Sequence, residues 1–261
     1  MQGGQHDLVS AEIGMAFGRA WCKDDRETLY FMSTDGGIYS MRRGERPVSL
    51  TEARIHSLTR DIDFSVDYVT MAWDQESLGF HVFIVPFQDG SSVSSTESFF
   101  YSRRDDAWLM DEYDIGIRCV AVAKGDRADE RIVMLGCDDG YIRQHDSDAK
   151  DDDGPPIFSS VLVGPLVPEA TANEWVLDRL IGVMAIEQGP VQYEVYRGFT
   201  ADQRELVASG FFKPGRNVPH FVRTSGASIW IRLFSGSTSA SWACESLQAE
   251  LYEGGPVRML A

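Results

Sequence analysis

Short apolar runs separated by polar turns fill the first 145 residues of the chain. Residues 29–32 and 37–41 have β-prone side chains and flank the turn Asp35-Gly36-Gly37, where glycine adopts a positive φ at little cost. The same arrangement returns at residues 131–143 around Asp138-Asp139-Gly140. The pattern predicts units of strand, tight turn and strand.

These units recur at a nearly constant spacing. The strands that start at Leu29, Phe80 and Ile132 are 80 − 29 = 51 and 132 − 80 = 52 residues apart, and Ala20-Trp21 returns 52 residues later as Ala72-Trp73. A period of roughly 40 to 50 residues, with several short strands in each unit, is typical of β-propeller blades.

We therefore predict an all-β fold in which residues 1–150 form a partial or open β-propeller of about three blades. The alternative is an ordinary β-sandwich whose hairpins look alike by chance.

A strongly acidic stretch follows the third unit. Residues 146–153 contain five aspartates and lead into Gly154-Pro155-Pro156. Like charges repel and proline removes a backbone donor, so we predict a linker at residues 151–156. A calcium loop is the sharper alternative for Asp146 to Asp153, because calcium prefers carboxylate oxygens, but the spacing and terminal glutamate of an EF-hand are missing.

Residues 157–261 are again rich in strand patterns. The runs 191–197 and 228–233 alternate apolar and polar side chains, and Gly, Ser and Pro occur between the runs. Alternation of this kind predicts strands with one buried face. The density of strands indicates a second domain built as a β-sandwich.

The net charge of −16 and the pI near 4.6 restrict the partners. Sequence-independent nucleic-acid binding needs Lys and Arg to neutralise phosphates, so the charge argues against it and also disfavours an anionic membrane surface. If the protein lined a conduit for DNA, this acidity would keep the DNA from sticking.

The chain has no apolar run long enough to cross a bilayer, and its first residues lack the basic and apolar regions of a signal peptide. We expect a soluble protein made in a cytoplasm. Cys22, Cys119, Cys137 and Cys244 form no CxxC pair. Cys22, Cys119 and Cys137 lie within or at the end of predicted strands and are expected to pack as small apolar side chains, and neither zinc nor a disulfide framework is expected.

Motifs for catalysis are missing from the sequence. There is no GxSxG, HExxH or glycine-rich phosphate loop, and no pair of carboxylates is singled out for glycoside hydrolysis. The histidines at positions 6, 56, 81, 145 and 220 show no metal-ligand spacing, and His81 is expected to be a half-buried packing residue. We predict no catalytic residue, no cofactor, no metal ligand and no enzymatic activity.

The segment Ser33-x-Asp35-x-Gly37 resembles the Asp-box turn of sialidase-like propellers. In that motif the aspartate stabilises a hairpin at the edge of a blade, away from the catalytic centre. A structural turn is therefore the favoured interpretation. A sialidase-like hydrolase is kept as a second alternative, and it requires Arg, Tyr and Glu side chains at the centre of the propeller.

The tryptophans offer platforms on which sugars can stack. Trp21 and Trp73 recur with the blade period and are expected in the core. Trp230 and Trp242 are the candidates for surface binding. Together with the polar loop 90–96, they are the basis for the first alternative function, a receptor- or glycan-binding module.

Several segments are similar to β-propeller tail and neck proteins, of the nozzle type, in tailed bacteriophages. They are residues 35–39, 99–108, 138–146, 241–247 and 254–258. The resemblance implies a non-enzymatic structural protein of the virion tail or neck, of the nozzle or tail-tube adaptor type. Such a protein, made in the host cytoplasm, assembles with other virion proteins and with itself in a ring.

Three blades are fewer than the roughly four to eight that close a propeller. The missing blades come from a longer parent chain or from other subunits, or the fold stays an open assembly. An uncovered sheet edge is an aggregation hazard, which favours a partner or a ring.

Overall fold

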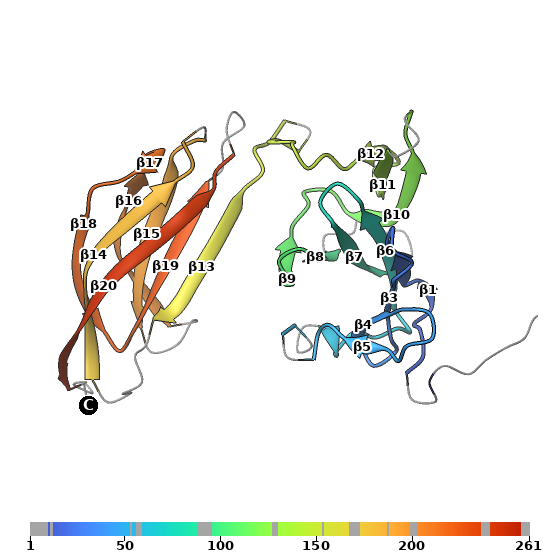
Figure 1. Ribbon diagram of the computed structural model, residues 1–261, viewed down its shortest axis with the longest axis horizontal. Helices are drawn as coiled ribbons and strands as arrows, with labels where there is room; N and C mark the ends of the chain where they lie inside the picture. The colour runs from blue at the N-terminus through green and yellow to red at the C-terminus, as the bar shows by residue number, and fades with distance from the viewer. Residues whose placement is uncertain are drawn as a thin grey trace, which may run out of the picture. The chain divides into compact units, whose positions relative to one another are not determined.

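The computed structural model describes residues 10, 13–52, 54–55, 59–87, 96–126, 130–152, 154–166, 173–186, 188–198, 203–235 and 241–256. All the named elements in these ranges are β-strands, which confirms the all-β class (Figure 1). The chain divides into two compact units, Met1–Asp148 and Ala149–Ala261.

The N-terminal unit contains three sheets, and among the described strands none of them closes on itself. The first sheet is β2 (Trp21–Lys23), β3 (Leu29–Met32), β4 (Ile38–Met41) and β5 (Val48–Ser49). The second is β1 (Gly18–Arg19), β6 (Asp67–Asp74), β7 (Gly79–Pro86), β8 (Glu97–Ser102) and β9 (Ala107–Asp111). The third is β10 (Ile117–Lys124), β11 (Arg131–Cys137) and β12 (Ile142–Gln144). Among the strands that the structure describes here, β1 is the one that pairs in parallel, with β6.

The second sheet is covered on both faces. Met71, Phe80 and Val82 point to one side and share a buried cluster with residues of the first sheet. Phe83 and Val85 point to the other side and share a cluster with residues of the third sheet. Burial on both faces explains why β7 reads as a continuous apolar run instead of an alternating one.

The repeated Asp-Gly turn forms the same hydrogen bonds in the first and third sheets. The N–H of Gly37 donates to Asp35 Oδ1 at 2.8 Å, and the N–H of Tyr141 donates to Asp139 Oδ1 at 3.1 Å. Gly36 and Gly140 have φ values of 80° and 85°, a region that favours glycine. The structure confirms a structural role for this turn.

The acidic stretch makes a local turn at the start of the C-terminal unit. The N–H of Asp152 donates to the carbonyl of Pro155 at 2.8 Å, and Asp151 pairs with Pro156 in an isolated bridge. The described residues of the predicted linker, 151–152 and 154–156, are therefore held together by local hydrogen bonds. The carboxylate of Asp151 accepts the N–H of Gly154, and Asp153 lies outside the described residues.

The described strands of the C-terminal unit form two sheets of four strands each. The first is β13 (Ser159–Leu166), β19 (Ser228–Ser235), β15 (Val191–Gly198) and β16 (Arg204–Phe212), in that order. In the second, β14 (Asn173–Met184) pairs with β20 (Cys244–Pro256) and with both β17 (Gly215–Arg216) and β18 (His220–Gly226). Side chains of both sheets share one buried cluster that includes Leu177, Leu180, Val195 and Ile231.

Candidate functional site

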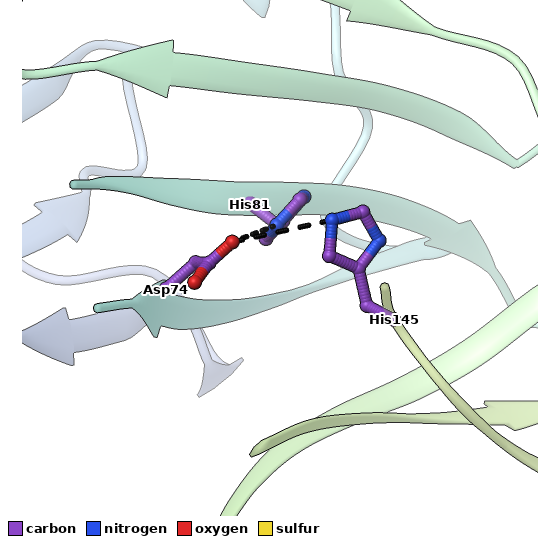
Figure 2. A group of neighbouring side chains, drawn as sticks. All are labelled: Asp74, His81 and His145. Carbon is purple, nitrogen blue, oxygen red and sulfur yellow. Dashed lines mark ion pairs between the residues drawn. The ribbon is translucent and has the colours of Figure 1, made fainter. Parts of the chain in front are cut away.

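Three side chains with metal-binding chemistry meet between the second and third sheets of the N-terminal unit. Asp74 ends β6, His81 lies in β7, and His145 follows β12 (Figure 2). Strand pairing places Ala72 opposite His81, so Asp74 and His81 share the face of the second sheet that packs on the third. The N–H of His145 donates to Val133 O at 2.8 Å and holds His145 beside β11.

The two imidazoles approach the same carboxylate oxygen. Asp74 Oδ2 lies 3.7 Å from His81 Nε2 and 4.0 Å from His145 Nε2. The two rings are 4.5 Å apart between centroids. The other oxygen, Asp74 Oδ1, accepts the N–H of Glu76 at 2.9 Å and that of Ser77 at 3.3 Å. The turn after β6 therefore orients the carboxylate so that Oδ2 faces the histidines.

Burial distinguishes this group from a surface ion pair. The side chains of Asp74 and His81 are 5% and 3% exposed, and His145 is 23% exposed. Neither ring nitrogen of His81 has a hydrogen-bond partner among the residues that the structure describes. His81 Nδ1 instead faces Asp111 Oδ2 of β9 at 3.8 Å. A buried imidazole without partners is costly and requires an explanation.

The electrostatic environment differs among the three neighbouring groups. Burial alone would raise the pKa of Asp74, but the His81 imidazole and the hydrogen bonds from Ser77 and Glu76 outweigh it and hold that pKa well below its usual range. Burial raises the pKa of Asp111, although His81 acts in the opposite direction. Burial lowers the pKa of His145. Asp74 is thus an anionic acceptor, and His145 favours the neutral imidazole that binds metals.

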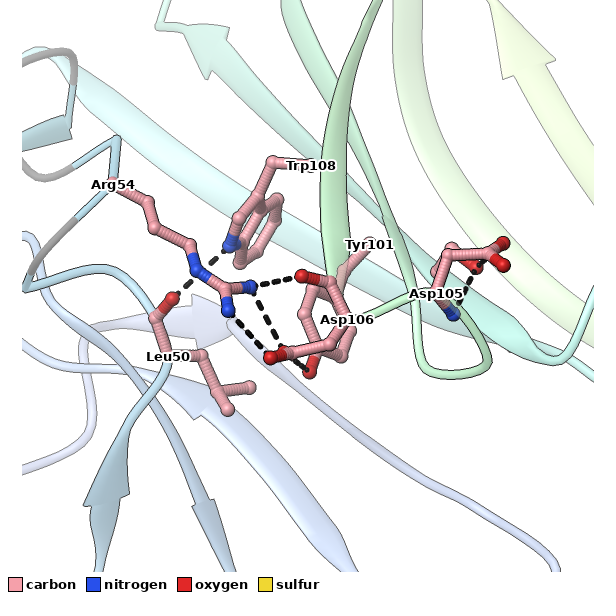
Figure 3. Close-up of polar contacts among 7 residues, drawn as sticks. Leu50, Arg54, Tyr101, Asp105, Asp106 and Trp108 are labelled. Atoms are coloured by element: carbon pink, nitrogen blue, oxygen red, sulfur yellow. Dashed lines mark hydrogen bonds and ion pairs between the residues drawn. The ribbon is translucent and has the colours of Figure 1, made fainter. Parts of the chain in front are cut away.

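A second polar group joins the first and second sheets (Figure 3). Arg54 Nη1 donates to Asp106 Oδ1 at 2.9 Å, Tyr101 Oη donates to the same oxygen at 2.7 Å, and Trp108 Nε1 donates to Leu50 O at 3.1 Å. The hydrogen bonds from Arg54 and Tyr101 lower the pKa of Asp106. These groups satisfy one another's hydrogen-bonding capacity. The network therefore connects the segment that follows β5 of the first sheet to the turn between β8 and β9.

A cavity of about 510 Å³ lies where β2, β6 and β10 of the three sheets come together. Its lining includes Trp21 and Lys23 of β2, Trp73 of β6 and Val122 of β10. Contacts of β6 with both β2 and β10 bring these strands side by side. Strands β2, β6 and β10 therefore line this cavity.

The outward faces of the first and third sheets are apolar. The first outer face consists of alternate residues of β2 to β4, on the side opposite to the residues that pack against the second sheet: Trp21, Lys23, Leu29, Phe31, Tyr39 and Met41, of which Phe31 is buried among its neighbours. The third outer face is defined in the same way by Cys119, Ala121, Ala123, Ile132, Met134 and Ile142, with Gln144 as its polar member. Trp21 is 41% exposed and Ile142 is 71% exposed. In a chain with a net charge of −16, two apolar sheet faces are conspicuous.

No protein-family model and no curated protein matches the chain. Among the residues described, no helix has the length and apolar character that a membrane span requires.

The tryptophans lie differently from the sequence prediction. Trp230 is only 2% exposed in β19, so the prediction of a surface-binding indole at this position is wrong. Trp242 is half-buried, and its Nε1 donates to Ser159 Oγ at 2.6 Å. Trp73 is buried as predicted, whereas Trp21 is not, because Cys22 is the residue of β2 that faces the core. The loop 90–95 lies outside the described residues.

Sequence reasoning missed the Asp74, His81 and His145 group, because its members are separated by 81 − 74 = 7 and 145 − 81 = 64 residues. The repeat contains one signal that points to this group. The first sheet has an equivalent arrangement in which Asp24 accepts hydrogen bonds from Arg26 N and Thr28 N and from Tyr30 Oη. The position of Tyr30 is taken by His81, 51 residues later. The second copy thus exchanges a phenol for an imidazole.

Proposed function

We propose that the protein is a non-enzymatic structural protein of a bacteriophage tail or neck, and that it works by packing its propeller-like sheets against those of another chain. The observation that carries the proposal is the pair of apolar outer faces on the first and third sheets. In a propeller, every blade packs face to face with two neighbours. The second sheet has both of these contacts within the chain, and the first and third sheets each have one.

A second copy of the same chain is the partner that these faces fit best. Strand pairing places one charged residue, Lys23, on the two faces, so their contact would bury little charge. Two copies of three sheets make six, which is within the roughly four to eight blades of closed propellers. The first outer face of each copy would then cover the third outer face of the other, so that both contacts are satisfied in a closed dimer.

The charge and the sandwich-like second unit are consistent with this role. The acidic surface would keep DNA from adhering to a virion component that surrounds its path, and the C-terminal unit would supply contacts to other virion proteins. A glycan-binding function is less favoured, because Trp230 is buried and the indole of Trp242 already has a hydrogen-bond partner.

The test is the mass of the purified protein in solution, measured by light scattering after size exclusion. We expect the wild type to elute at twice the 29.1 kDa of one chain. The variant Ile142→Glu should elute as a monomer, because a carboxylate buried in an apolar contact costs roughly 3 kcal/mol, which weakens association about 100-fold or more.

Ile186→Glu is the matched control. Ile186 is 79% exposed and belongs to the C-terminal unit, so this variant should remain a dimer. Trp21→Glu, on the other outer face, should dissociate the dimer as Ile142→Glu does. A wild type that stays monomeric at every concentration would overturn the proposal.

A further inference from the structure

We propose that Asp74, His81 and His145 bind a divalent transition-metal ion of the zinc type, which fastens the second sheet to the third. This inference concerns a site that the assembly function does not require. It rests on the convergence of three ligand atoms and on the unsatisfied burial of His81.

The ligand atoms are already close to the arrangement of a metal centre. Asp74, His81 and His145 each offer one ligand atom, and these three atoms all lie within 4.8 Å of one another. Two ligands that each bind zinc at roughly 2.0–2.2 Å in a tetrahedron stand about 3.4 Å apart. The distances of 3.7 and 4.0 Å from the carboxylate oxygen to the two nitrogens therefore need to shorten by less than an ångström. The partly exposed His145, which follows the last strand of the third sheet, is the ligand best placed to move.

Of the three residues, His81 is the one whose unsatisfied ring nitrogens a bound ion would stabilise most. Its ring is 3% exposed, and neither nitrogen has a hydrogen bond within the described part of the chain. Coordination through Nε2 would give this nitrogen a partner and fix the proton on Nδ1, which faces Asp111 at 3.8 Å. A histidine that binds metal with one nitrogen and points the other to a carboxylate is the usual arrangement around protein-bound metals.

A simple Asp–His pair explains the geometry less well. One imidazole would be enough to partner Asp74 Oδ2, yet two converge on this oxygen while Oδ1 is occupied by the backbone of the next turn. Two imidazoles whose rings are 4.5 Å apart cannot both be charged there without repulsion. A cation between two neutral imidazoles and one carboxylate resolves this conflict.

The donor set selects the class of metal. Two imidazole nitrogens and one carboxylate oxygen suit zinc, iron(II), cobalt(II) and related ions, whereas calcium and magnesium prefer ligand sets made of oxygen. Because Asp74 and His81 belong to the second sheet and His145 follows the third, the ion would act as a cross-link between them. Metal binding should therefore be visible as a gain in thermal stability.

The experiment uses the full chain after dialysis against a chelator. Zinc is titrated by calorimetry, cobalt(II) by its visible absorption, and thermal unfolding is followed with and without zinc. We expect one equivalent to bind, without the absorption bands of thiolate ligands. Zinc at about 100 times its dissociation constant should raise the Tm of the N-terminal unit by roughly 5–10 °C.

The variant His145→Ala should weaken metal binding by roughly 100-fold or more and abolish the Tm shift. His220→Ala, which removes a histidine of the C-terminal unit, should bind as the wild type does. Asp74→Asn keeps an oxygen for the turn amides and tests the site if His145→Ala fails to fold. Absence of stoichiometric binding to the wild type, or unchanged binding to a folded variant at position 145 or 74, would overturn the proposal.

Discussion

Replacing Phe80 by alanine is expected to lower the free energy of unfolding of the N-terminal unit by about 3–5 kcal/mol. Phe80 is fully buried, and its ring lies 4.8 Å from that of Tyr30, 5.1 Å from that of Tyr101 and 5.6 Å from that of Trp108. The change would leave a cavity where the first and second sheets meet. Neighbouring aromatic rings are too rigid to refill it.

Urea unfolding, together with the hydrogen exchange of amides in β6 and β7, measures this loss of stability separately from the stability of the C-terminal unit. Phe17→Ala is the matched control, because Phe17 is 76% exposed and its truncation should change stability by no more than about 0.5 kcal/mol. Equal losses in the two variants would show that Phe80 is not at the centre of a packed core.

The second large effect is expected from Gly36→Ala. An alanine at this position would have to adopt a φ of 80°, and its Cβ would lie 2.3 Å from the backbone oxygen of Thr59 and 2.8 Å from the Cα of Arg60. Backbone strain and overlap with backbone atoms add together, so we expect a loss of roughly 2–5 kcal/mol.

The variant Gly140→Ala separates the cost of backbone strain from the cost of overlap with neighbouring atoms. Gly140 occupies the equivalent turn of the third sheet with a φ of 85°, but an added Cβ meets no described atom within 4 Å. This variant should lose about 1–2 kcal/mol, the cost of the backbone conformation alone. The difference between the two variants, measured by urea unfolding, gives the contribution of the contact with Thr59. A difference near zero would contradict the close packing of that segment on the turn.

Assembly and metal binding are independent of each other. Assembly depends on the outer faces of the first and third sheets, whereas the metal site lies between the second and third sheets of one chain. A monomer that binds zinc would overturn the first and support the second. A dimer without metal affinity would do the reverse.

Local structure could be predicted from the sequence because its signals are local. The Asp-Gly turns need particular residues at particular positions, and β-prone residues flank them, so the turns around Asp35 and Asp139 and the all-β class were predicted from the residues alone. The repeat of 51–52 residues also corresponds to real equivalence, since the two turns share their hydrogen bonds and the sign of φ.

Only the tertiary structure decided which face of each strand is covered. Trp21 and Trp73 recur at the expected spacing, but one is 41% and the other 6% exposed, because strand pairing turns Cys22 toward the core of the first sheet. Trp230 is buried for the same kind of reason. The approach of His145 to Asp74 and His81 depends on packing between two sheets, and no pattern in a single strand carries that information. Periodicity thus determined the strands and turns, and long-range packing determined the candidate site.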